Sequence, residues 1–155
     1  MRQLSEKLKA FPKIGLDTSI FIYHFEEHPV YLSLTQELLS GVESGHREAV
    51  TSTITLLELI AQPLRLNRQD IARKYEALLV NFPNLDVLDL DREVIRRAAQ
   101  LRADFRIRPA DALQVAAGLV SGGNAFITND RRLECIHSQT EVIVLDDFLR
   151  RSSGS

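Results

Sequence analysis

Residues 13–19 read KIGLDTS, a short and mostly apolar run that ends in a carboxylate and is followed by two hydroxyl side chains. A run of this length predicts a buried strand, and Thr18 and Ser19 are residue types that favour the start of a helix. The stretch therefore predicts a strand that leads directly into a helix, with Asp17 at the junction.

Strand-like and helix-like stretches alternate along the rest of the chain. Pro63 is expected to end or kink one of the helices, because proline cannot donate the backbone hydrogen bond of a helix interior. Strands that alternate with helices imply crossover connections and a mainly parallel sheet with helices on both faces, so the fold class is α/β. The further strands are expected at 48–52, 85–90, 125–128 and 142–145, and the helices at 20–25, 30–42, 53–61, 68–82, 92–104 and 110–120.

The length and composition predict one folded domain. The chain has 155 residues, of which 45% are hydrophobic and 26% charged, and this size suits one core rather than two. No internal repeat or linker divides it. We expect an N-terminal extension at residues 1–12, a single domain at 13–148 and a disordered C-terminal tail at 149–155.

Charge and cysteine content narrow the function classes. The formal net charge is −2, so no positive field covers the whole molecule, although residues 64–110 carry ten basic and seven acidic side chains. The single cysteine, Cys135, excludes an internal disulfide and a multi-cysteine zinc site. No apolar run is long enough to span a membrane, and residues 1–12 lack the apolar core of a signal peptide. We therefore expect a cytoplasmic protein without a membrane partner.

Four carboxylates are candidates for a site. Asp17 and Asp130 each follow a predicted strand, and ligands of parallel sheets bind beyond the carboxyl ends of the strands. Glu58 interrupts the apolar helical run ITLLELI, and Asp111 lies in the first helical turn after Pro109. Each acid also has a purely structural explanation, as a helix cap, a partner of the helix dipole or a solvated helix edge.

The order of these motifs is more specific than any one of them. The strand-end D-T-S, the mid-helix glutamate, the helix start P-A-D-A-L and the strand-end T-N-D resemble the PIN-domain nucleases, most closely the VapC-like toxins of toxin-antitoxin pairs. The resemblance implies a three-layer α/β/α fold with a central sheet of four to five strands. It also implies that the four acids share one pocket, where Ser19 orients the first acid by hydrogen bonding and Thr128 matches the threonine before the last acid.

The resemblance implies a metal-dependent endoribonuclease, and carboxylate oxygens are indeed the preferred ligands of Mg²⁺ and Mn²⁺. The family's usual partners are an RNA substrate, a cognate antitoxin and a second copy of the chain, so we expect a homodimeric toxin. Alternatives are a stand-alone RNA-processing nuclease and a degenerate PIN domain that only binds. A haloacid-dehalogenase phosphatase is disfavoured because Ser19 stands where that class needs a second aspartate. The pocket alone does not choose RNA over DNA.

An acidic pocket repels a phosphate backbone, so positive groups near it must hold the substrate strand. Ordinary solvated helix surface is the alternative explanation for each of these arginines. The candidates for RNA binding are Arg108, Arg131 and Arg132 beside the predicted acids, and Arg65 and Arg68 in the basic middle of the chain.

Overall fold

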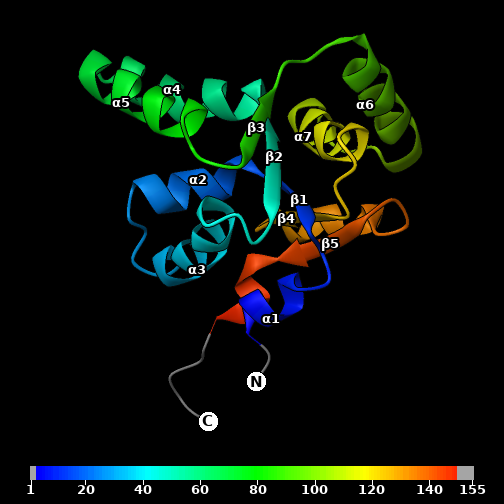
Figure 1. The fold of residues 1–155 in the computed structure, drawn as a ribbon. Helices are drawn as coiled ribbons and strands as arrows, with labels where there is room; N and C mark the ends of the chain where they lie inside the picture. Colours follow the sequence, from blue (N-terminus) through cyan, green and yellow to red (C-terminus); the bar gives the residue numbers. More distant parts are fainter. Residues whose placement is uncertain (1–2, 150–155) are drawn as a thin grey trace.

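The fold is a five-stranded sheet in which all neighbouring strands are parallel, with the order β3-β2-β1-β4-β5. The computed structural model describes residues 3–149, and Figure 1 shows its helices on either side of the sheet. The predicted tail at 149–155 lies outside the described residues from residue 150 onward. The strands are β1 (Lys13–Leu16), β2 (Glu48–Ser52), β3 (Leu85–Leu88), β4 (Ala125–Thr128) and β5 (Glu141–Val144).

Helices cover both faces of the sheet, which confirms the predicted three-layer α/β architecture. One hydrophobic core collects side chains from the first five helices, and a second core collects side chains from the later ones. The helices are α1 (Leu4–Leu8), α2 (Thr18–Phe25), α3 (Leu32–Glu43), α4 (Thr53–Arg65), α5 (Gln69–Val80), α6 (Arg92–Phe105) and α7 (Pro109–Val120), with short 3₁₀ helices η1 (Arg131–Ile136) and η2 (Leu145–Phe148).

The strand β4 shows how the sequence divides its side chains between the two cores. Ala125 and Ile127 belong to the first core, and Phe126 between them belongs to the second. Successive side chains of a strand point to opposite faces of the sheet, so a fully apolar strand must be covered on both sides. All four residues of β4 are buried, as expected for the interior of a parallel sheet.

The N-terminal segment is more closely packed than its description as an extension implies. Leu4 and Leu8 on α1 are each 1% exposed and belong to the first core. They lie four residues apart, on one face of the helix. Residues 4–8 therefore form part of the same hydrophobic core as the predicted domain.

The helix α4 continues through Pro63 to Arg65 instead of ending near residue 61. Proline removes only its own backbone donor, and here it lies in the last turn, where the helix is about to end. Pro63 is buried, and the N–H of Leu66 closes the turn on the carbonyl of Gln62 at 3.1 Å. None of the helices within residues 3–149 is long and apolar enough to cross a membrane.

Candidate active site

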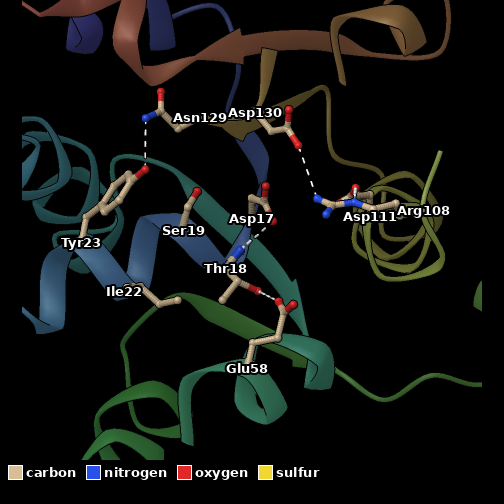
Figure 2. A pocket seen from close by; sticks show the side chains of 10 residues that line it. All are labelled: Asp17, Thr18, Ser19, Ile22, Tyr23, Glu58, Arg108, Asp111, Asn129 and Asp130. Carbon is tan, nitrogen blue, oxygen red and sulfur yellow. Dashed lines mark hydrogen bonds and ion pairs between the residues drawn. The ribbon is translucent and has the colours of Figure 1, made fainter. Parts of the chain in front are cut away.

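A pocket of about 290 Å³ opens at the carboxyl edge of the sheet and contains all four predicted acids. Asp17 comes from the end of β1, Glu58 from α4, Asp111 from the first turn of α7 and Asp130 from the segment after β4. Parallel strands end at the same edge, which is why segments far apart in the sequence meet here. Figure 2 shows the ten lining residues: Asp17, Thr18, Ser19, Ile22, Tyr23, Glu58, Arg108, Asp111, Asn129 and Asp130.

Asp17 is the most enclosed of the four carboxylates. Its Oδ1 accepts the backbone N–H of Thr18 at 2.8 Å, so it caps α2, and its Oδ2 accepts the hydroxyl of Thr128 at 2.6 Å. Burial above all, together with the negative charges of Asp111 and Glu58, raises the pKa of Asp17 to about 6, although the two hydrogen bonds act to lower it. The charged form of Asp17 is therefore held in the fold at a cost in free energy.

Ser19 does not make the hydrogen bond that the resemblance implies. Its Oγ is buried and has no hydrogen-bond partner within residues 3–149. The two oxygens of Asp17 are already engaged by Thr18 and Thr128, so Thr128 orients the carboxylate instead. Ser19 still lines the pocket, where it leaves an unused polar atom next to the acids.

Glu58 is exposed but is held in place by one short hydrogen bond. The hydroxyl of Thr18 donates to its Oε1 at 2.6 Å, as Figure 2 shows. A charge on the apolar helix α4 has to be solvated or partnered, and here it is both. The bond ties Glu58 to the residue that directly follows Asp17.

Asp111 and Asp130 share the guanidinium of Arg108. Its Nε donates to Asp111 Oδ2 at 3.0 Å, and its Nη2 lies 3.5 Å from Asp130 Oδ2. Arg132 binds Asp130 through two nitrogens, at 3.0 and 2.7 Å, and these hydrogen bonds lower the pKa of Asp130 below its ordinary value. Asp130 also caps η1 by accepting the N–H of Arg132 at 3.0 Å.

The donor set fits a hard divalent cation in chemistry and in charge. Four carboxylates line the pocket against the single arginine Arg108, and the buried Ser19 Oγ adds an unpartnered oxygen. Hard cations such as Mg²⁺ take oxygen ligands of this type. Nevertheless, no three acidic, histidine or cysteine side chains within residues 3–149 form a group that could hold one metal ion. Arg108 occupies oxygens of two of the acids.

A buried polar network below the pocket was not anticipated from the sequence. Gln114 on α7 is 3% exposed, and its Nε2 donates to the hydroxyls of Thr18 and Thr55 at 2.8 and 2.7 Å. Its position among the apolar residues of α7 could have indicated such a network, because an amide on a buried helix face needs hydrogen-bond partners. Asn129 was also missed; its Nδ2 donates to the Tyr23 hydroxyl at 3.1 Å.

The structure divides the arginine candidates. Arg108 lines the acidic pocket and Arg132 pairs with Asp130, whereas Arg131 pairs with Asp147 at 2.7 Å and does not line the pocket. Arg65 and Arg68 are exposed and do not line it either. Arg68 forms an ion pair with Asp70 at 3.0 Å.

Comparisons with known proteins agree with this architecture. The sequence profile of the PIN domain family matches residues 14–137, a range that contains all four acids. No curated protein sequence matches the chain significantly.

Several solved structures share the fold. VapBC2 from Rickettsia felis, bound to a DNA fragment from its promoter, matches with a TM-score of 0.64 and 18% identity, over 84% of this chain and 96% of that one. DNA-bound VapBC from Salmonella typhimurium matches with a TM-score of 0.61 and 24% identity, over 86% and 98%. FitAcB from Neisseria gonorrhoeae matches with a TM-score of 0.63 and 19% identity, over 86% and 97%.

Proposed function

The chain belongs to the PIN domain family, and from that premise we propose that it is a Mg²⁺- or Mn²⁺-dependent endoribonuclease and the toxin of a toxin-antitoxin pair. The observation that carries the proposal is the meeting of Asp17, Glu58, Asp111 and Asp130 in one pocket, although they come from four separate segments. Capping at the strand ends would bring only Asp17 and Asp130 to this edge of the sheet, whereas Glu58 and Asp111 join them from two helices.

The chain's own residues prepare the pocket for a cation and a phosphate. When bound, a divalent cation lowers the pKa of a coordinated water and neutralises charge on the phosphate in the transition state. Asp17 is well placed to engage such a cation, because its pKa is raised to about 6 and it forms no ion pair with a basic side chain within residues 3–149. Thr128 and the N–H of Thr18 fix the direction of its two oxygens.

Arg108 and Arg132 are suited to bind the phosphates of the RNA substrate. A guanidinium presents paired donors that match phosphate oxygens as well as carboxylate oxygens. Both side chains are largely exposed, with 64% and 70% of their surface accessible. Substrate phosphates can therefore compete with Asp111 and Asp130 for these groups, which frees the acids for the cation.

The partners follow from the same relatives. Chains of this fold have been crystallised in toxin-antitoxin complexes, some bound to DNA. We propose that this chain likewise has a cognate antitoxin and forms a homodimer. Exposed leucines on α4 support a protein interface, since Leu57 and Leu64 are 61% and 46% exposed.

One observation favours a second candidate, a domain that binds but does not cut. Arg108 bridges Asp111 and Asp130, and residues 3–149 contain no three-residue metal group. If Arg108 stays there, Asp111 and Asp130 are not free to bind a catalytic cation. Mn²⁺ titration of the purified protein separates the two candidates, because only the nuclease must bind the ion.

Cleavage of RNA by the purified chain tests the main proposal. We expect cleavage in Mg²⁺ or Mn²⁺, none in excess EDTA, and none by Asp17→Asn, which keeps the shape of the side chain but removes its charge. The matched control is Asp86→Asn on β3, because Asp86 is an exposed aspartate that does not line the acidic pocket. Cleavage by Asp17→Asn at the wild-type rate would contradict the mechanism.

A further inference from the structure

A second hollow, of about 200 Å³, adjoins the acidic pocket. Arg108 and Asp111 line both cavities, so their ion pair lies where the two cavities adjoin. The rest of the second hollow comes from the end of α6 and from η1. Its remaining lining residues are Phe105, Arg106, Ile107, Arg132, Leu133 and Cys135.

The charge of the second hollow is opposite to that of the first. Three arginines face a single carboxylate, Asp111, whereas the acidic pocket has four carboxylates and one arginine. Arg108 and Arg132 are paired with acids, but Arg106 is exposed and takes part in none of the ion pairs within residues 3–149. Arg106 thus lines the basic cavity as a cation that has no ion-pair partner among the described residues.

The backbone that carries Arg106 is well anchored. Arg106 caps α6 in the left-handed conformation (φ 57°, ψ 32°), and its N–H bonds to the carbonyl of Arg102 at 3.0 Å. The Nε of Arg102 donates to the carbonyl of Ile107 at 3.0 Å, and the Ile107 side chain is buried in the second core. Hydrogen bonds therefore hold the backbone on both sides of Arg106, so its side chain starts from a well-defined position.

The hollow also has an apolar part. Leu133 is buried, Phe105 is partly buried, and both belong to the second core or pack against it. The exposed Cys135 completes this side. A ligand that matches the cavity carries a negative charge for the arginines and a flat apolar group for the wall, and a nucleotide has both.

We propose that this hollow holds the nucleotide next to the cleaved bond, with its phosphate at Arg106 and its base or sugar against Phe105 and Cys135. The inference rests on the proposed nuclease function, because it takes the acidic pocket as the place of cleavage. The adjoining cavities then separate two tasks. The acidic one holds the reacting phosphate with its cation, and the basic one holds the neighbouring phosphate without a cation.

Cys135 offers a direct test, because it is the only cysteine in the chain and lines the hollow. In the Asp17→Asn background, which leaves the hollow intact, the rate of Cys135 alkylation by N-ethylmaleimide is measured with and without a random-sequence 12-nucleotide RNA at low salt. We expect saturating RNA to slow alkylation about tenfold. RNA that binds, by fluorescence anisotropy, without slowing the alkylation of Cys135 would overturn the proposal.

Substitutions at Arg106 identify the phosphate contact. Glycine adopts the left-handed conformation without steric cost, so Arg106→Gly removes the cation and leaves the turn intact. We expect Arg106→Gly to weaken RNA binding several-fold and to lower the slope of log affinity against log salt by about 0.7. Arg106→Lys should restore most of the binding. Arg73→Ala on α5, an exposed arginine that lines neither cavity, is the matched control; equal loss in Arg106→Gly and Arg73→Ala would contradict the assignment.

Two further results keep this inference separate from the proposed function. Poly-glutamate that protects Cys135 as well as RNA does would point to an acidic protein segment and overturn the nucleotide assignment. Wild-type protein that cleaves RNA while Cys135 stays unprotected in the dead variant would leave the nuclease function standing and refute the hollow. Wild-type protein that cleaves no RNA, combined with protection of Cys135 that depends on Arg106, would support nucleotide binding in the hollow. It would refute the nuclease function and, with it, the position of that nucleotide next to a cleaved bond.

Discussion

Gln114 Nε2 donates to Thr18 Oγ1 at 2.8 Å across 96 positions of sequence. The same amide nitrogen donates to Thr55 Oγ1, and the amide oxygen accepts the hydroxyl of Ser52 at 2.7 Å. Thr18 is left free to donate its own proton to Glu58. One buried side chain of α7 thus joins the starts of α2 and α4 and fixes the donor that holds Glu58 at the pocket.

The first prediction follows from this network. Gln114→Ala leaves the buried hydroxyls of Thr18 and Thr55 without a donor, and we expect the free energy of unfolding to fall by about 1–3 kcal/mol. RNA cleavage should fall as well, because Glu58 is no longer oriented. Urea denaturation and cleavage rates measure the two effects. Gln100→Ala is the matched control, since Gln100 is exposed on α6 and bonds only to Asp104; an equally small effect of both variants would argue against the network.

The second prediction concerns Asp17 and pH in metal-free buffer. The folded-state pKa, about 6, exceeds the ordinary value of 3.8, so between these values the folded state keeps a proton that the unfolded state has lost. This contribution to stability is full below about pH 4 and disappears as the pH rises through 6. Asp17→Asn should therefore match wild type near pH 4 and exceed it by about 1–3 kcal/mol near pH 8. Urea denaturation across this range checks it, and parallel curves for the two proteins would refute it.

The third prediction separates two amide variants that are both expected to abolish cleavage. Asp17 forms no ion pair with a basic side chain in the described part of the chain, residues 3–149, so Asp17→Asn should raise the melting temperature in EDTA. Asp111 pairs with the exposed Arg108 at 3.0 Å. Asp111→Asn should therefore leave the melting temperature unchanged or lower it, with a loss of up to about 1 kcal/mol in the free energy of unfolding, because exposed ion pairs contribute little. Thermal melting of both variants measures the difference. An equal rise in melting temperature in both would mean that Arg108 does not neutralise Asp111.

The fourth prediction concerns the binding of RNA phosphates by the arginines at the start of η1. In the Asp17→Asn background, Arg132→Ala should lower the salt slope of RNA binding by about 0.7–0.9 and weaken binding to all RNA sequences alike. Arg131→Ala should have a smaller effect, because Arg131 pairs with Asp147 and lines neither cavity. Binding isotherms over a salt series measure the slope, with Arg73→Ala as the control. Slopes that coincide with that of the parent protein would show that Arg131 and Arg132 do not hold phosphates.

The fifth prediction concerns assembly. Leu57 and Leu64 lie seven residues apart on α4 and are both exposed, so they share one face of the helix. We expect a homodimer at tens of micromolar by light scattering, and a monomer for Leu64→Glu with unchanged helix content. Ile95→Glu on α6, an equally exposed apolar residue, should stay dimeric. A strictly monomeric wild type would refute the dimer.

Local sequence patterns predicted the strands and the positions of Asp17 and Asp130 after two of them, whereas the common pocket of all four acids was expected only from the family resemblance. Apolar runs that end in Asp17 and Thr128 are local patterns, and the backbone geometry of a parallel sheet then brings their ends to one edge. Periodicity in the same way predicted the amphipathic helices, including the start of α7 at Pro109. These features depend on neighbours within a few residues, which a single sequence records directly.

The contacts between individual side chains could not be read from these patterns. Arg108 bridges Asp111 and Asp130, Thr128 rather than Ser19 orients Asp17, and Gln114 supports Thr18. Such pairs depend on how far each crossover helix rotates and shifts on the sheet, and small differences there change the partner of a side chain. The pattern that sets a helix does not encode these relative positions, because they result from packing the two cores against one sheet.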